Sequence, residues 1–286
     1  MSIRILTDST SYIPQDLRNE LGITVIPLSV QFPDESFKET EVDYDYFYSK
    51  IAKEGVIPTS SQPSQAAIYG EFLSAAAKGD ETVAIFISSD MSGTYETAVA
   101  ARRMAIEKYP ETKIAILDSR TNCMSLGLPV IEAAKAVKEG RSFDEVIDIA
   151  NQTIKRVNFY FIPANLEYLK KGGRIGGAAA LLGALLKITP ILTVTHGKTD
   201  VLKRARGTQA AINDMLARLD DDAKEYGLSH LVVHHIQCEQ KGLELAGKLK
   251  EKYGMDIPVV SIGPVIGLHV GPGAIGFVYC TIKDLR

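Results

Sequence analysis

The stretch TVAIFISSDMSGTYETAVAARRMAIEKY, residues 82–109, places a strand, a polar loop and a helix in immediate succession. Residues 82–88 are apolar and rich in β-branched side chains, which predicts a buried strand. The stretch from Thr94 to Tyr109 predicts a helix. A buried strand followed closely by a helix is the building unit of an α/β fold with a parallel sheet.

The same unit recurs through the first half of the chain. Residues 3–6 and 113–117 predict further buried strands, and residues 14–21, 63–78, 126–139 and 143–156 predict helices. We expect these elements to form a parallel sheet covered on both faces. Residues 31–48, rich in tyrosines and acids, are expected to form a loop.

The second half has a different rhythm. Residues 165–171 predict a short helix, and residues 191–195 and 201–206 predict a hairpin that turns at residues 196–199. A helix over 208–226, a strand over 230–236, a helix over 241–253 and strands over 258–262 and 274–282 follow. The sequence therefore predicts an α/β fold of two domains, residues 1–158 and 159–286, the second also α/β.

Composition excludes several classes of protein. The 286 residues are 45% hydrophobic and 23% charged, and the net charge of −3 does not favour nucleic acid. The three cysteines are far apart, so neither a disulfide framework nor a metal site is expected. We see no secretory signal and expect a cytoplasmic protein. Residues 175–195 are almost uncharged, but Lys187 and Pro190 interrupt them, so a buried helix followed by a strand is expected rather than a membrane span.

Three of the predicted strands end in short polar runs. Asp8 and Ser9 follow the first strand, residues 88–94 the middle one, and Asp118 and Ser119 the last. Because the carboxyl ends of parallel strands line the ligand crevice of such sheets, we expect the three runs to meet at one rim. Each run taken alone also fits ordinary turn and capping residues.

The middle run is the most informative, because Ser92 and Gly93 directly precede the helix that begins at Thr94. A helix N-terminus presents unbonded N–H groups and attracts anions, and glycine lets a ligand approach the backbone. The run Ser60-Ser61-Gln62-Pro63-Ser64 also precedes a helix and presents hydroxyls. Together they could hold the two oxygens of a carboxylate, although a purely capping role for both remains open.

A glycine-dense run, GPVIGLHVGPG, covers residues 263–273 and contains His269. It predicts a tight loop that places His269 at the rim of the site. Residues 271–276 match G-x-G-x-x-G, but a strand follows and Pro272 removes a donor, so a dinucleotide site is rejected. His234 and His235 should point to opposite faces of one strand and are poor joint metal ligands. A triad of Ser92, His269 and Asp8 can be written down without specific support from the spacing.

Taken in order, these motifs resemble the DegV family of bacterial fatty-acid-binding proteins. The matching elements are TDS at 7–9, SSQPS at 60–64, SGTY at 92–95, DS at 118–119, LEYLKKGGRI at 166–175 and GLHVGPG at 267–273. They span nearly the whole chain. The resemblance implies two α/β domains with one long-chain fatty acid buried between them, no cofactor and no turnover of its own.

The resemblance also assigns roles to residues. It implies that Ser60, Ser92 and His269 hold the carboxylate, with Ser60 replacing the threonine of the family pattern. We expect Asp8, Ser9, Gly93, Thr94, Asp118 and Ser119 to support the site. The Ala/Leu/Gly stretch from Ile175 to Leu186 could form a wall of the acyl tunnel or simply be core.

Some members of the family present the acid to an ATP-dependent fatty acid kinase, which makes acyl phosphate for phospholipid synthesis. Basic residues gather in two clusters, 170–174 and 203–206. We expect Arg174, Arg204 and Arg206 to be candidates for docking such a kinase, although basic clusters are usually only solvated surface. The main alternative function is a Ser/His hydrolase or acyltransferase that acts on a lipid. A transcription regulator is a weaker alternative, without a helix-turn-helix pattern.

Overall fold

The computed structural model describes residues 2–182 and 188–285. The chain divides into two compact units, the first made of Met1–Glu41 and Ser60–Ile154 and the second of Val42–Thr59 and Lys155–Arg286. The chain therefore passes between the units three times, and residues 42–59 belong to the second unit although the first surrounds them in sequence. Within the described residues, none of the helices has both the length and the apolar character needed to cross a bilayer.

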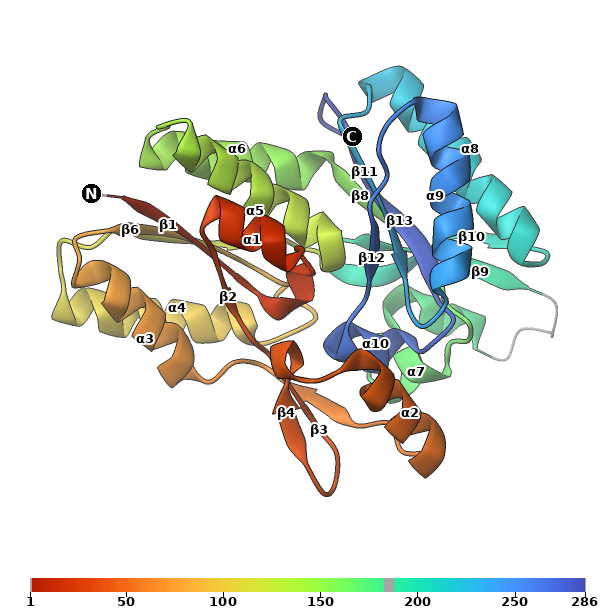
Figure 1. Ribbon diagram of the computed structural model, residues 1–286, viewed down its shortest axis with the longest axis horizontal. Helices are drawn as coiled ribbons and strands as arrows, with labels where there is room; N and C mark the ends of the chain where they lie inside the picture. Colours follow the sequence, from red (N-terminus) through yellow and green to blue (C-terminus); the bar gives the residue numbers. More distant parts are fainter. Residues whose placement is uncertain (1, 183–187, 286) are drawn as a thin grey trace. The chain divides into compact units, whose positions relative to one another are not determined.

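The first unit is built on a parallel four-stranded sheet in the order β2-β1-β6-β7. Its strands are β1 (Ile3–Asp8), β2 (Ile23–Ile26), β6 (Glu81–Phe86) and β7 (Ile114–Asp118). Helices α3 (Gln65–Ala76) and α4 (Thr94–Lys108) lie on one face, and α1 (Gln15–Leu21), α5 (Cys123–Lys138) and α6 (Phe143–Arg156) lie on the other (Figure 1). The predicted parallel sheet with two covered faces is confirmed.

Small side chains let α4 lie close to this sheet. Ala98, Ala101 and Ala105 form a buried stripe on α4 at helical spacing. They pack in one core cluster with Phe86 of β6 and Phe72 of α3. Because alanine side chains are small, this face of α4 can pack close to the sheet, and the packing holds the N-terminus of α4 in place.

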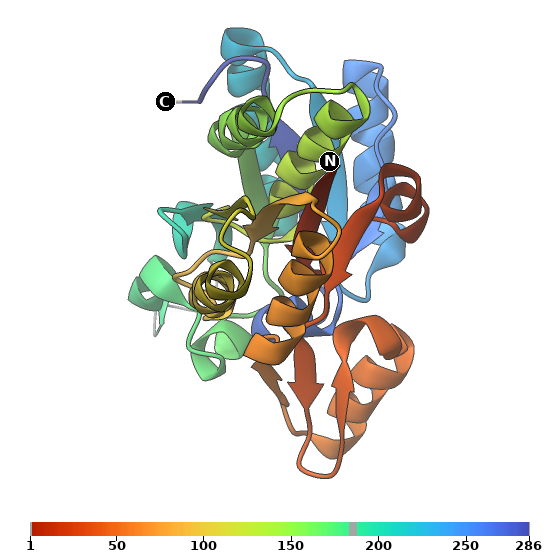
Figure 2. The same cartoon turned by 90° about the vertical axis from the view of Figure 1, so that its left-hand side faces the viewer.

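The expected loop over residues 31–48 is wrong. Strands β3 (Ser29–Gln31) and β4 (Ser36–Lys38) form a hairpin, which joins β5 (Thr59–Ser61) in a three-stranded sheet of order β4-β3-β5. Figures 1 and 2 both show this hairpin projecting away from the four-stranded sheet. Helix α2 (Tyr44–Glu54) follows the short 3₁₀ segment η2 (Glu39–Glu41). The α2 N-terminus is capped by the Asp43 carboxylate, which accepts from Tyr46 N at 2.8 Å.

The second unit contains a six-stranded mixed sheet in the order β10-β9-β8-β13-β11-β12. The strands are β8 (Val157–Ile162), β9 (Thr189–Thr195), β10 (Lys198–Ala205), β11 (His230–His235), β12 (Val259–Ser261) and β13 (Ile275–Cys280). All neighbours pair antiparallel except β11 and β12. Helices α8 (Thr208–Tyr226) and α9 (Glu239–Tyr253) pack on the same core cluster as the strands. The predicted β9–β10 hairpin and α8 are confirmed.

A buried polar network links α8 to this sheet. The Tyr279 hydroxyl donates to the carboxylate of Asp222, which lies on α8, and its oxygen lies 2.8 Å from the Tyr160 hydroxyl oxygen. The amide of Asn158 donates to both phenol oxygens, at 3.1 and 3.2 Å. Arg218 completes the network from the surface through an ion pair of 3.2 Å with Asp222.

The buried helix expected over residues 175–186 is not found in the described part of that range. A short 3₁₀ helix, η3 (Gly176–Leu181), follows α7 (Glu167–Lys171), and most of its residues are exposed. Gly176 has φ +50, and a Cβ there would lie 2.0 Å from the Thr199 carbonyl oxygen on β10. The glycines therefore serve a close approach to the hairpin. Residues 183–186 of the predicted helix lie outside the described residues.

Candidate functional site

The start of α4 carries the most specific polar arrangement in the first unit. Gly93 is the N-cap residue, with no side-chain capping bond, and the helix runs for 15 residues. The hydroxyls of Ser92 and Thr94 lie 2.9 Å apart, and Thr94 N donates to Ser92 Oγ at 3.4 Å. Ser92 is half-buried and Thr94 is fully buried. Hydroxyl groups and helix N–H groups in this arrangement suit a carboxylate or phosphate oxygen.

Gln62 connects this helix start to the Ser60–Ser64 run. Its Nε2 donates to Thr97 Oγ1 on α4 at 2.7 Å. A Cβ at Gly93 would lie 2.3 Å from Gln62 Oε1, so a larger residue there would displace this side chain. At the end of the run, Ser64 caps α3 by accepting from Ala67 N at 3.2 Å. The two hydroxyl-rich segments are therefore neighbours, with Ser60 half-buried on β5.

The side chains of Asp8 and Ser9 are bonded to backbone of the neighbouring loops. Asp8 Oδ1 accepts from the backbone N and the hydroxyl of Thr10, and Oδ2 accepts from Ile87 N at 2.7 Å. Ser9, in the 3₁₀ segment η1 (Ser9–Ser11), accepts from Leu28 N at 3.0 Å. Complete burial raises the pKa of Asp8, while these three hydrogen bonds lower it. Asp8 thus fixes the loop that leads from β6 to Ser92.

Asp118 and Ser119 organise the loop after β7. Asp118 accepts from the Ser89 hydroxyl at 2.6 Å and from Arg120 N at 2.9 Å. Ser119 is buried, and its hydroxyl donates to the Thr121 carbonyl at 3.1 Å. Arg120 also pairs with Asp90. The polar runs after β1, β6 and β7 therefore lie together at one end of the sheet, as the strand pattern predicts.

In the second unit, His269 lies on a helix rather than in the expected loop. Residues Pro264–Val270 form α10, with Pro264 in its first turn. Gly267 lets the Tyr48 side chain of α2 lie close to this helix, because a Cβ there would lie 1.7 Å from the Tyr48 hydroxyl oxygen. Gly271 ends the helix with φ +85 and lies against the Tyr168 ring.

Two residues of the LEYLKKGGR motif, Gly172 and Arg174, lie near His269. A Cβ at Gly172 would lie 2.1 Å from His269 Nδ1, so glycine is needed to admit the imidazole. Arg174 bonds to the Gly172 carbonyl at 2.8 Å and is exposed. Burial, together with the nearby positive charge of Arg174, lowers the pKa of His269 to about 4. His269 is therefore a neutral imidazole at pH 7.

The other predicted residues have simpler surroundings. Arg204 lies near the end of β10, Arg206 follows the strand, and both are exposed. His234 and His235 face opposite sides of β11 as predicted: His234 bonds to the Val260 carbonyl at 2.9 Å, and His235 contacts Gly242 of α9. In the part of the chain that the structure describes, His, Cys, Asp and Glu side chains form no cluster of metal-binding size.

The sequence motifs include Gln62 and Gly172 but gave neither a role, and they do not include Tyr48. Gln62 is separated from Gly93 by a complete helix and strand, and Tyr48 is far from Gly267 in sequence. Gly93, Gly172 and Gly267 all lie in the motifs quoted from the sequence, and at each of them a Cβ would collide with a polar side chain.

Comparison with known proteins gives one consistent answer. The model of a family described as "Uncharacterised protein, DegV family" matches residues 2–281. A DegV domain-containing protein of Clostridium acetobutylicum is 51% identical over 286 residues, covering 100% of both chains.

Two solved structures share the fold over their full length. One is a DegV family protein from Thermus thermophilus described as binding fatty acid, with TM-score 0.88 and 30% identity, covering 98% of this chain and 100% of that chain. The other is DegV of Bacillus subtilis, described as a fatty acid binding protein, with TM-score 0.86, 32% identity and coverage of 98% and 99%. With a family model that spans almost all of its residues and a relative identical at half of its positions, the chain belongs to the DegV family.

Proposed function

We propose that this protein is a cytoplasmic carrier that binds one long-chain fatty acid and has no turnover of its own. The carboxylate is held by the hydroxyls of Ser60 and Ser92, with His269 as a further contact. The observation that carries the proposal is the start of α4, where Gly93 leaves the helix N-terminus without a side-chain cap and the Ser92 and Thr94 hydroxyls lie 2.9 Å apart. The fatty-acid-binding relatives support the choice of ligand.

The chemistry of the groups favours a carboxylate. Hydroxyls and helix N–H groups donate hydrogen bonds to an anion, and the neutral imidazole of His269 can donate one without introducing a buried positive charge. Affinity would come mainly from the acyl chain, at about 0.8 kcal/mol for each buried CH₂ group. The polar contacts would then select the carboxylate and fix its orientation.

Native mass spectrometry of the protein purified from cells tests the proposal. We expect one fatty acid for each chain in the wild type and clearly less in Ser92→Ala, because the hydroxyl donor is lost. Ser49→Ala is the matched control, since Ser49 lies exposed on α2. An unliganded protein that also fails to take up added fatty acid would contradict the proposal.

The hydrolase alternative predicts a different result with the same variants. A nucleophilic serine would be labelled covalently by a fluorophosphonate, and Ser92→Ala would abolish the label. The two oxygens of Asp8 already accept hydrogen bonds from Thr10 and Ile87, which does not suit the third member of a triad. We therefore expect no labelling of Ser92.

We further propose that the carrier presents its carboxylate to an ATP-dependent fatty acid kinase, and that Arg174, Arg204 and Arg206 contribute to docking. All three side chains are exposed. Exposed guanidinium groups suit a partner that carries phosphate.

The kinase proposal is tested by phosphorylation of bound fatty acid with purified kinase and ATP. We expect Arg206→Ala to keep its lipid but to be phosphorylated several-fold more slowly. Arg103→Ala, an exposed arginine on α4 of the first unit, is the control. A normal rate with Arg206→Ala would remove Arg206 from the docking surface.

A further inference from the structure

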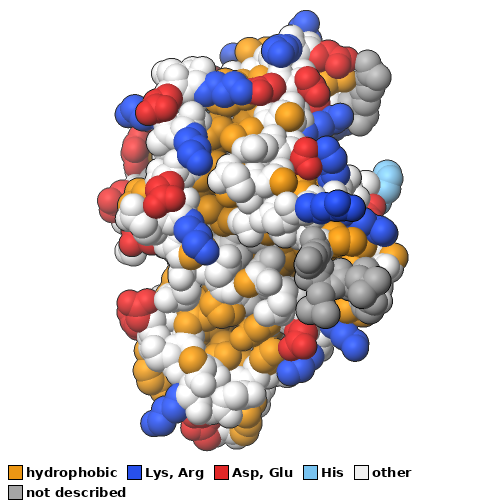
Figure 3. Space-filling view, turned by 90° about the vertical axis from the view of Figure 1, so that its right-hand side faces the viewer, with side chains coloured by type: hydrophobic (Ala, Val, Ile, Leu, Met, Phe, Trp, Pro, Cys, Tyr) orange, Lys and Arg blue, Asp and Glu red, His pale blue; other side chains and the backbone are white. Residues whose placement is uncertain are grey.

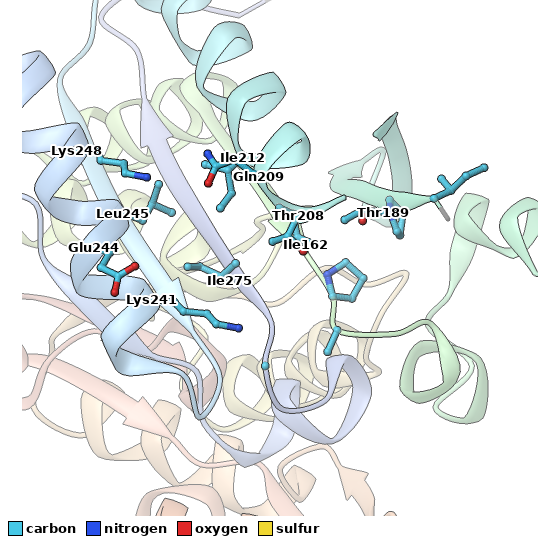
Figure 4. A pocket seen from close by; sticks show the side chains of 15 residues that line it. Ile162, Thr189, Thr208, Gln209, Ile212, Lys241, Glu244, Leu245, Lys248 and Ile275 are labelled. Atoms are coloured by element: carbon cyan, nitrogen blue, oxygen red, sulfur yellow. The ribbon is translucent and has the colours of Figure 1, made fainter. Parts of the chain in front are cut away.

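A separate pocket of about 550 Å³ lies within the second unit, between α8 and α9. Its lining includes Ile162 from β8, Ile275 from β13, the first residues of α8 and one face of α9 (Figure 4). The volume lies in the range of small-molecule sites. None of the residues proposed above to hold the fatty acid carboxylate lines it.

The floor of this pocket is apolar. Ile162 and Ile275 are paired neighbours on adjacent strands, and Leu245 of α9 packs in the same core cluster. Ile212 of α8 is only partly buried against that cluster, so its side chain faces the open space. Figure 3 shows hydrophobic side chains exposed between charged ones on the right-hand face of the molecule. A ligand with an apolar part would remove such surface from water.

The side formed by α9 carries two lysines. Lys241, Glu244, Leu245 and Lys248 recur at the spacing of one helical face, and Figure 4 shows both lysines extending toward the space between the helices. Neither lysine forms an ion pair with a described residue. Lys250 and Lys252, on another part of α9, are paired with Asp256 and Asp220.

Charge in the pocket sums to little more than one positive unit. Two lysines and one glutamate give a net charge of +1, and the N-terminus of α8 at Thr208 adds a partial positive charge. This balance matches a monoanion better than a dianion. From the apolar floor and the two lysines, we propose that the pocket binds an amphiphilic monocarboxylate, with the carboxylate at Lys241 and Lys248 and the apolar part over Ile212 and Ile275.

Titration of sodium octanoate, followed by methyl NMR of isoleucine-labelled protein, tests this site. We expect saturable shifts of the Ile162, Ile212 and Ile275 methyl groups in the wild type. The double variant Lys241→Gln/Lys248→Gln should bind about tenfold more weakly, because two charge-assisted contacts are lost. Lys250→Gln, on the same helix, should bind as the wild type does. Gln209→Trp should also weaken binding, since an exposed side chain at the rim is replaced by one large enough to fill it.

The same titration in Ser92→Ala separates this site from the proposed fatty acid site. Unchanged octanoate shifts there support an independent pocket, and their loss overturns it. Equal binding of octanol would contradict the role of the lysines, and tighter binding of octyl phosphate as a dianion would contradict the charge balance. An absence of saturable shifts in the wild type would overturn the proposal outright.

Discussion

The four-stranded and the six-stranded sheet carry their buried and half-buried polar groups in different places. In the parallel sheet, Asp8, Asp118 and Ser119 lie at or just beyond the ends of strands, and their bonds go mostly to loop backbone. In the mixed sheet, Tyr160 and Tyr279 bond to Asp222 on the covering helix. The first arrangement shapes loops that could receive a ligand, whereas the second fastens α8 to its sheet. The hydrogen bonds of these polar side chains therefore position the loops of the candidate site in the first unit and helix α8 in the second.

Asp222→Ala should produce the largest effect, because the buried phenol groups of Tyr160 and Tyr279 lose their common acceptor. We expect a loss of about 4 kcal/mol in the free energy of unfolding. Urea unfolding, combined with hydrogen exchange of β8 and β13, would measure it. Asp221→Ala removes the exposed neighbouring carboxylate and should change stability by less than about 0.5 kcal/mol. Equal effects of the two variants would show that the network does not fasten α8.

Asp8→Asn should act on the loops of the first unit instead. The new NH₂ group would face a donor, either at Thr10 or at Ile87 N. We expect a loss of about 2–3 kcal/mol and faster hydrogen exchange around residues 86–88. Asp16→Asn, at an exposed position of α1, serves as the control. Unchanged exchange around Ile87 would contradict the positioning role of Asp8.

Lowering the pH should reduce the stability of the second unit, because the buried His234 takes up a proton less readily in the folded state than in the unfolded chain. Burial lowers the pKa of His234 to about 4, and the proximity of His235 contributes in the same direction. The unfolded chain binds this proton below about pH 6.5, but the folded chain does not until about pH 4, so stability falls as the pH decreases through this window.

Between pH 7 and pH 5 the expected loss from His234 is about 2 kcal/mol. His235 and His269, whose pKa values are also lowered, should add to the total. Urea unfolding of wild type and His234→Gln at several pH values isolates the His234 contribution as a difference in slope. If the free energy of unfolding depends on pH in the same way in both proteins, His234 does not contribute to the acid sensitivity.

Substitution of alanine for glycine should change stability in opposite directions at two positions of the second unit. Gly172→Ala would push a Cβ against His269, so we expect a loss of about 1 kcal/mol and a shifted imidazole NMR signal. At Gly247, inside α9, a Cβ meets nothing within 4 Å, and Gly247→Ala should gain about 0.5–1 kcal/mol. Midpoints of thermal unfolding would rank the three proteins, and a stabilised Gly172→Ala variant would contradict the close fit.

Regular periodicity made much of this fold predictable. The bounds of α6 and α8 follow directly from the pattern of apolar residues, and the β9–β10 hairpin follows from its turn. Strand β8 was missed because it begins at Val157, immediately after α6 ends at Arg156, so no loop separates the two patterns. Helix α2 was missed because its buried face consists of Phe47, Tyr48 and Ile51 among acids and tyrosines.

The candidate site was predictable only where it is local. Ser92 and Gly93 reveal their place at a helix start from three consecutive residues, and Asp118 reveals its place from the end of a strand. The neighbours of His269 could not be found in this way, because Gly172 is brought to it by the packing of α7 against α10. Non-local contacts of single residues have no period and therefore no pattern in the sequence.

The segment that crosses early into the second unit has a consequence for synthesis on the ribosome. Helix α2 ends at Glu54, but α10, which its Tyr48 contacts, begins at Pro264. At about 5–20 residues per second, translation of the intervening chain takes roughly 10–40 seconds. During that time Tyr48 has no α10 against which to pack. A chaperone would therefore have this interval in which to bind the nascent helix.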